Sequence, residues 1–331
     1  MNRRAFSIAL AVVAAALIPG SSAMAQNYSV QSISDANLGD VVSAASGTST
    51  FRSNASSGAV TLQSGSAVRL SSTSANAVVT IGCSNSVLCA TTAVSVTLAH
   101  AGTPSGRLDY IPSVGVANGT ATITSAYSAG SYVVINLSPI PRNSSRTFLL
   151  GFDMPVLGNE SSRSTGSAVS SYLITASRPS GSGSSSQVGD IIAKVLRPIA
   201  IAKTQDLQFG SVTRPSSGSG SITVSPSGSA SSTGTNVRRF STPAPSAAAF
   251  TVTGEGGQAV TVSVPSTVSL NGPAGTVVAT TTATGSGSQV LNGSAGAAGT
   301  VQVKVGGTVP LTQTTGIGTF SGALTVTVQY N

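Results

Sequence analysis

Few residues of this chain are of the types that do chemistry, and their spacing matches no common active site. His100 is the single histidine, so a histidine-based triad or a multi-histidine metal site would have to be built around it. It follows an alternating apolar run at residues 94–98, where a structural role is the default for a histidine. The eight acidic residues are dispersed, and Asp35 and Asp40 are the closest pair, so none stands out for paired-carboxylate hydrolysis.

Sequence motifs for catalysis and nucleotide binding are also missing. The chain contains no G-x-S-x-G elbow, no G-x-x-x-x-G-K phosphate loop and no G-x-G-x-x-G after a strand. Its Gly-Ser-Gly runs have the composition of linkers. We therefore expect a protein that is not an enzyme and has no catalytic residues, no cofactor and no metal site.

The two cysteines are the clearest chemical pair. Cys83 and Cys89 bracket residues 84–88 between two strand-like runs. In an exported protein such an even pair predicts a disulfide, here one that pins a hairpin. Closing so short a loop would remove about 2 kcal/mol of unfolded-chain entropy. A metal or redox pair is the alternative, but the spacing is not C-x-x-C and no ligand cluster accompanies it.

Export is predicted by residues 1–25, which read as a signal peptide. Arg3 and Arg4 precede an apolar run at residues 5–18, and Ala23, Met24 and Ala25 form an A-x-A cleavage site before Gln26. The run is too short to span a bilayer, and no later stretch is long and apolar enough. The twin arginine also resembles the signal for folded-protein export, but we favour the general secretory route because cysteines oxidise outside the cytoplasm. We expect the protein in the periplasm in transit, and then at the cell surface or outside the cell.

The composition favours an all-β fold. Removing residues 1–25 leaves 306 residues, and the loss of two arginines lowers the net charge from +8 to +6. At about 150 residues per domain, this length suggests two domains. The chain is 7% charged and 4% aromatic and has no Trp, while short Val and Ile runs recur at strand spacing. Disorder is disfavoured because the mean hydropathy is positive, at +0.29.

The positive charge does not form a patch. The arginines and lysines are scattered, and after the signal only Arg238 and Arg239 are adjacent. Nucleic-acid-binding proteins cluster cations on one face and interleave aromatic residues. We therefore expect no nucleic-acid partner.

The chain reads as two imperfect copies of one β-rich unit. Residues 154–157 (Met-Pro-Val-Leu) correspond to residues 309–311 (Val-Pro-Leu), and several strand-like runs recur in the same order. Between the copies lies a run rich in Ser and Gly, which predicts a flexible linker. We expect a divergent β-sandwich over residues 26–178, a linker over residues 179–189 and a second β-sandwich over residues 190–331.

The last sixteen residues carry the strongest local pattern. Apolar side chains occupy the even positions Phe320, Leu324, Val326, Val328 and Tyr330, and polar ones occupy most of the odd positions. Because strand side chains alternate between two faces, the pattern predicts a strand with one buried face. The general alternative is an edge strand of any β-sandwich. About seven short strands with turn residues between them predict an immunoglobulin-like sandwich for the second half.

Four motifs occur in order in the second half: Leu-x-Phe-Gly-x-Val at 207–212, Phe-Thr-Val-Thr-Gly at 250–254, Val-x-Val-Gly-Gly-Thr at 303–308, and Gly-x-Phe-x-Gly followed by Val-Thr-Val-x-Tyr at 318–330. Together they resemble domain-of-unknown-function family 4402, which is similar to spore-coat-U-type and archaic chaperone–usher pilins of Gram-negative bacteria. Tyr330 at the penultimate position and Gly318, fourteen residues from the end, match the terminal strand of pilins. The first half matches loosely, since it lacks the Phe-Gly pair.

The resemblance implies two immunoglobulin-like, pilin-like domains and assembly through β-strand addition. The partners it implies are subunits of the same or a related type, a periplasmic chaperone and an outer-membrane usher. Residues 318–330 would then line a groove that a partner strand completes, and residues 26–36 are the free segment that could serve as a donor.

Two functions remain open. The first is a structural subunit of a surface fibre or layer, and the second is a two-domain adhesin whose first half binds a receptor. Sugar-binding sites usually stack aromatic rings on the sugar, and the first half has few aromatic residues. Because its strand pattern echoes the second half, we favour the structural role.

Overall fold

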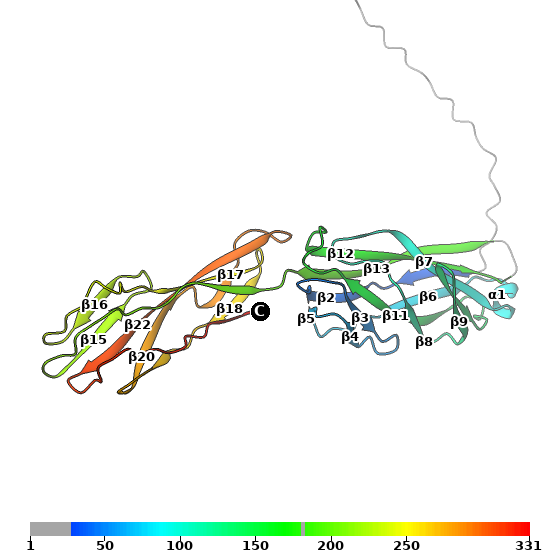
Figure 1. Ribbon diagram of the computed structural model, residues 1–331. Helices are drawn as coiled ribbons and strands as arrows, with labels where there is room; N and C mark the ends of the chain where they lie inside the picture. Colours follow the sequence, from blue (N-terminus) through cyan, green and yellow to red (C-terminus); the bar gives the residue numbers. More distant parts are fainter. Residues whose placement is uncertain (1–27, 180–182) are drawn as a thin grey trace, which may run out of the picture.

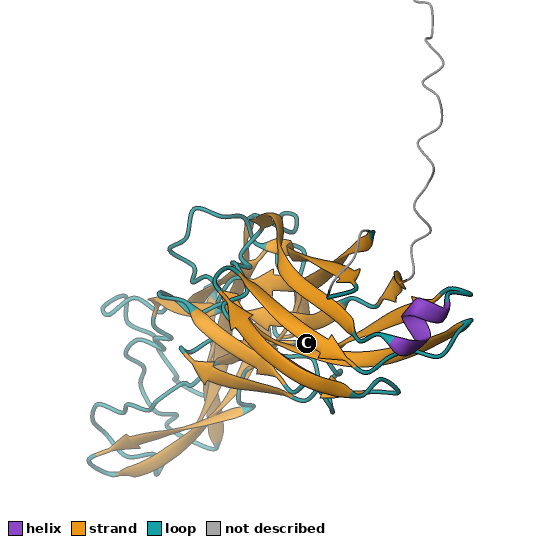
Figure 2. Ribbon diagram, turned by 90° about the vertical axis from the view of Figure 1, so that its right-hand side faces the viewer, coloured by secondary structure: helices purple, strands orange, loops and turns teal. Residues whose placement is uncertain are grey.

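The computed structural model describes residues 28–179 and 183–331. The signal peptide and cleavage site predicted at residues 1–26 lie outside the described residues. Two β-rich bodies lie end to end, joined near residues 197–199 (Figure 1). One short helix, α1 (Val87–Thr91), lies at the far end of the first body, and strands dominate the rest of the described chain (Figure 2). The predicted all-β fold is confirmed.

The first domain is a sandwich of two sheets. One sheet has the order β1 (Tyr28–Ile33), β6 (Ala77–Cys83), β11 (Ser144–Val156), β3 (Ser49–Ser53) and β4 (Val60–Ser64), and β8 (Val114–Asn118) also pairs with β11. The other has the order β5 (Val68–Arg69), β2 (Ala36–Val42), β13 (Ser184–Leu196), β12 (Gly166–Ser177), β7 (Val94–Ser105), β10 (Tyr132–Leu137) and β9 (Ile123–Ala129).

The core of the first domain lies between these sheets and follows the period of two. In β12 every second residue is buried, including Tyr172, Ile174 and Ala176. Phe148 and Phe152 of β11 are buried opposite, and the Phe152 ring lies 5.0 Å from the Tyr172 ring. Apolar side chains from both sheets thus form one continuous core.

The predicted linker at residues 179–189 and the predicted second-domain start at residue 190 are wrong, because residues 184–196 form strand β13. Residues 184–196 pair antiparallel with all of β12 and parallel with β2, inside the first domain. The Ser-rich start of this strand is paired because its short hydroxyls fit a sheet, as in the 2.8 Å hydrogen bond between Thr175 and Ser186. Serine and glycine content suggested flexibility, whereas pairing with the preceding strand β12 decides the structure here. The boundary between the two domains lies at Arg197 and Pro198.

The second domain has one large and one small sheet. The large sheet has the order β14 (Ala200–Gln205), β17 (Ala248–Glu255), β22 (Ala298–Thr312), β15 (Ser219–Val224) and β16 (Ala230–Thr233), and the hairpin β19 (Thr267–Gly272) with β20 (Gly275–Thr284) joins it through β22. The small sheet has the order β21 (Gly287–Val290), β18 (Ala259–Ser263) and β23 (Thr327–Tyr330). Its core is split into two clusters, one around Phe250 and Val260 and one around Ile222 and Leu311.

Candidate functional site

The terminal strand lies at the edge of the small sheet. β23 pairs antiparallel with β18, so that Val328 lies opposite Val262 and Tyr330 opposite Val260. No strand of the described residues pairs with the other edge of β23. The residues before it, 322–326, have no backbone hydrogen bond to any described residue. One side of the terminal segment is therefore open for pairing.

The alternation predicted for the terminal segment is present, but its inner face is only half covered. Leu324, Val326, Val328 and Tyr330 are part-buried against the core, whereas the odd-numbered residues between them are exposed. A strand in the interior of a sandwich would bury such residues fully. They remain partly open because no strand lies over them on the free side.

A second free edge faces the same side of the domain. β14 is the edge strand of the large sheet, and residues 206–214 continue beyond it. This continuation is held on one side only, by isolated bridges from Gln208 to Ser246 and from Val212 to Arg239. The other side of residues 206–214 has no partner strand in the described chain.

A groove of about 1160 Å³ runs between these two free edges. Its walls are residues 206–214 and residues 315–324, and most of the side chains at its base are apolar. They include Ile222, Phe250, Leu270, Val277, Val309 and Leu311. The groove thus exposes part of the core that a complete sandwich would cover.

Glycines of the terminal motif shape one wall of the groove. The Phe320 ring lies over Gly272, where a Cβ atom would fall 2.6 to 2.8 Å from three ring atoms. Gly318 has a φ of +140°, which an L-residue with a side chain rarely adopts. The nearby Ile317 is 76% exposed at the groove. Gly322, the second glycine of the Gly-x-Phe-x-Gly motif, has no room for a side chain, because a Cβ atom there would fall 2.2 Å from the Ser269 carbonyl oxygen.

Few charged residues line the groove. Lys203 and Asp206 form an exposed ion pair at 2.6 Å, and Arg214 is the other ionisable residue that lines it. Apolar walls with unpaired backbone edges suit an extended, apolar segment rather than a reacting small molecule. The groove brings together Gly318, Phe320 and Leu324, whereas Val326, Val328 and Tyr330 extend the wall beyond it toward the first domain.

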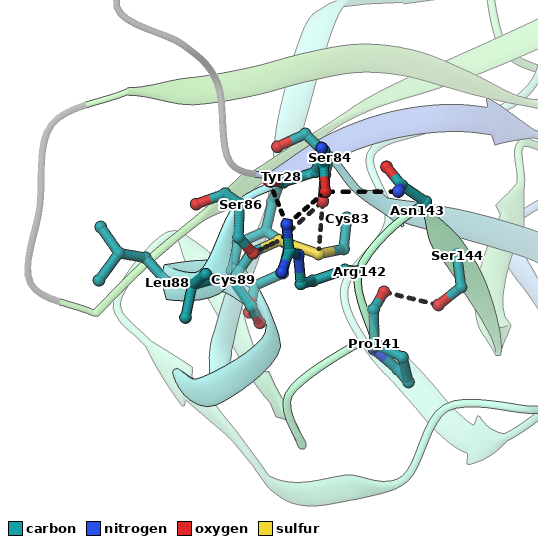
Figure 3. Close-up of a disulfide and its surroundings, with 12 residues drawn as sticks. Tyr28, Cys83, Ser84, Ser86, Leu88, Cys89, Pro141, Arg142, Asn143 and Ser144 are labelled. Atoms are coloured by element: carbon teal, nitrogen blue, oxygen red, sulfur yellow. Dashed lines mark hydrogen bonds between the residues drawn. A yellow bond between two sulfur atoms is a disulfide. The ribbon is translucent and has the colours of Figure 1, made fainter.

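The structure joins Cys83 and Cys89 in a disulfide, as the sequence predicted (Figure 3). The intervening segment differs from the predicted hairpin, because Cys89 lies in α1. The Tyr28 hydroxyl donates hydrogen bonds to the carbonyls of Cys89 and Thr92, and burial raises the pKa of this phenol. Arg142 donates to the Asn85 side chain at 2.6 Å. The loop is thus held by covalent and polar contacts, with Leu88 pointing away into solvent (Figure 3).

The other chemical candidates are not brought together. The His100 ring lies edge-on to Tyr110 at 5.3 Å, and Asp40 lies 3.8 Å from Lys194. In the described ranges, no three His, Cys, Asp or Glu side chains gather as metal ligands. Nor does any helix within them have the length and apolarity needed to cross a membrane.

Sequence reasoning missed Glu255 and Arg197, which lie where the two domains meet. Glu255 is fully buried and Arg197 lies 3.5 Å from it. In the sequence Glu255 stands beside Gly254, Gly256 and Gly257, a composition typical of a turn. No local signal identified it, because its partners come from residues 165, 197 and 296.

Comparisons with known proteins agree with the resemblance in the second half. Residues 199–330 match the family model described as "Domain of unknown function (DUF4402)". No curated protein matches the chain. Among solved structures, one of a chaperone–tip adhesin complex of CFA/I fimbriae is similar, with 10% identity, a TM-score of 0.27, and coverage of 91% of this chain and 98% of that one. Another is the CsuC–CsuE chaperone–tip adhesion subunit complex of archaic Csu pili from Acinetobacter baumannii, with 12% identity, a TM-score of 0.27, and coverage of 91% and 99%.

Proposed function

We propose that this chain is a non-enzymatic, exported subunit of a surface fibre, and that it accepts a β-strand from a partner chain in the groove of its second domain. The observation that carries this proposal is a pair of free backbone edges beside an open apolar groove: residues 206–214 form one wall, and residues 322–326 continue the other, which they line as far as residue 324.

Strand addition would satisfy both edges at once. An inserted strand would form main-chain hydrogen bonds with the two walls, and its alternate side chains would cover the apolar base. It would also complete the burial of Leu324 and Phe320, which are only part-buried now. An edge of this kind left open in solution favours aggregation, so a chaperone strand would fill it in the periplasm and a subunit strand afterwards.

The first domain supports a position at the end of the fibre. Its last strand, β13, lies between β2 and β12 inside a sheet and is not free to be donated. The predicted donor, residues 26–36, is not free where the structure describes it, because β1 pairs with β6 and Tyr28 is buried. The described residues therefore offer an acceptor groove but no free donor strand. This favours a two-domain end subunit, an adhesin on a pilin-like base, over a repeating subunit.

Co-expression in the periplasm tests strand addition. We expect the chain to be captured as a one-to-one complex by a periplasmic chaperone of its own bacterium, and to aggregate or be degraded without it. Ile317→Asp places a charge at an exposed position of the groove, so it should reduce capture without unfolding the second domain. Thr325→Asp, on the exposed outer face, is the matched control.

One combination of results would contradict strand addition. A wild-type chain that is a stable monomer alone, is not captured, and protects the amides of residues 322–326 from exchange would show that the second domain is complete by itself. The proposal would then fail.

A further inference from the structure

A buried carboxylate lies between the two domains. Glu255, the last residue of β17, is 0% exposed. Its Oε1 accepts a hydrogen bond from Thr165 Oγ1 of the first domain at 3.0 Å, and another from the Gly296 amide of the second. A buried carboxylate is stable only while such partners stay in place. Glu255 therefore depends on the contact between the domains.

Arg197, the residue that connects the domains, is the second part of this contact. Its amide donates to Glu255 Oε2 at 3.3 Å, and its Nη2 donates to the Gly296 carbonyl at 3.0 Å. Its Nε lies 3.5 Å from Glu255 Oε2 as an ion pair that lacks hydrogen-bond geometry. These contacts fold the connecting segment against the end of the second domain.

The terminal strand reaches the same point through Tyr330. The Tyr330 hydroxyl donates to the Arg197 carbonyl at 2.9 Å and accepts from the Glu255 amide at 2.7 Å. The side chain that ends β23 is thus bonded to both residues of the junction. Figure 1 places the C-terminus beside the narrow connection between the domains. The Tyr330 hydroxyl therefore links the terminal strand β23 to the junction between the domains.

We propose that the seating of the terminal strand and the orientation of the first domain are coupled through the Tyr330 hydroxyl. When β23 is seated on β18, the hydroxyl holds Arg197 and Glu255 together, and the first domain takes one angle. When β23 is displaced, the Arg197 carbonyl and the Glu255 amide lose their partner and the junction loosens. A further consequence rests on the proposed function: a partner strand that holds β23 in place would also set the angle of the first domain.

Single-molecule energy transfer between the domains tests the coupling. The labels are placed at Tyr127→Cys in the first domain and Val290→Cys in the second, both exposed positions. The native cysteines are joined to each other and do not react with thiol dyes. In this labelled background we expect one narrow distance distribution, and we expect Tyr330→Phe, which removes only the hydroxyl, to broaden it and shift its centre.

A second variant acts on the strand instead of the junction. Val328→Asp disturbs the inner face of β23 away from the hydroxyl and should broaden the same distribution. Gln329→Asp changes the adjacent outward-facing residue and should leave it unchanged. If Val328→Asp unfolds the second domain, as circular dichroism would show, Tyr330→Phe decides the question alone.

An unchanged, narrow distribution in Tyr330→Phe, with both domains folded, would overturn the coupling. The samples contain no chaperone and no donor strand, and the high dilution of a single-molecule measurement keeps the chain from aggregating. A failure here is therefore independent of strand addition, and a failure of chaperone capture leaves this measurement valid.

Discussion

The ring and hydroxyl of Tyr330 lie in the space that a side chain on Gly254 would need. A Cβ atom at Gly254 would also lie 2.8 Å from Leu291 Cδ1 in the buried core. Two motifs far apart in the sequence, Phe-Thr-Val-Thr-Gly and Val-Thr-Val-x-Tyr, are thus linked by one close approach.

Gly254→Ala is therefore expected to destabilise the second domain. Overpacking of this kind costs about 1–3 kcal/mol, since either the tyrosine or the strand must move. Urea unfolding of the mature chain, kept dilute to prevent aggregation, measures the change. Gly115→Ala is the control, because the nearest atom to its new Cβ would be the Gly151 carbonyl oxygen, 3.9 Å away. Equal stability of the two variants would contradict the close approach.

Protein purified from the periplasm should contain the Cys83–Cys89 bridge. Intact mass should show no alkylation without prior reduction and two alkylated thiols after it. Replacing both cysteines by serine should lower the stability of the first domain by about 2 kcal/mol, because the unfolded chain regains the entropy of a short loop. Two alkylated thiols in unreduced material would disprove the bridge.

Tyr172→Phe should stabilise the first domain at neutral pH. The Tyr172 hydroxyl is fully buried and has no hydrogen-bond partner among the described residues, so removing it should gain about 1 kcal/mol. Thermal unfolding of the variant, with the exposed Tyr127→Phe as control, measures this gain.

The same variant should change the response to alkaline pH. Burial, with smaller contributions from Asp35 and Asp190, raises the pKa of Tyr172 well above its ordinary value. The folded state therefore holds this proton more tightly than the unfolded state, and the associated stability is lost as pH rises above about 10. The stability advantage of Tyr172→Phe should grow above that pH. A constant difference between pH 7 and 11 would argue against a buried, neutral phenol.

Hydrogen exchange should be fast at the open edge of the second domain and slow in the paired strands of the first domain. Amides of residues 322–326 have no partner in the described structure and should exchange quickly, whereas those of β12 and β13 should be protected. Exchange followed by mass spectrometry resolves both segments in one experiment. Slow exchange at residues 322–326 in the chain alone would mean that this edge is covered.

Local patterns in the sequence predicted the strands but not their neighbours. The alternation from Leu324 to Tyr330 depends on a period of two within one segment, so it could be read directly. The open side of that segment could not, because a missing neighbour is a property of the whole domain. Glu255 was missed for a related reason, since its hydrogen-bond donors come from three separate parts of the chain. The Ser-rich start of β13 was missed for a different reason, because it pairs with the preceding strand at positions 174–177 although its composition is typical of a linker.

The position of β13 has a mechanical consequence. This strand leads directly into the connection between the domains (Figure 1), and it is paired with β12 along nearly its whole length and with β2 over residues 191–196. A pull on the second domain, with the first domain attached to a surface, would draw β13 along its own axis. Its hydrogen bonds to β12 and β2 run across that axis, so the load would be shared among many of them at once instead of opening them one by one. The first domain is therefore built to resist traction through its last strand.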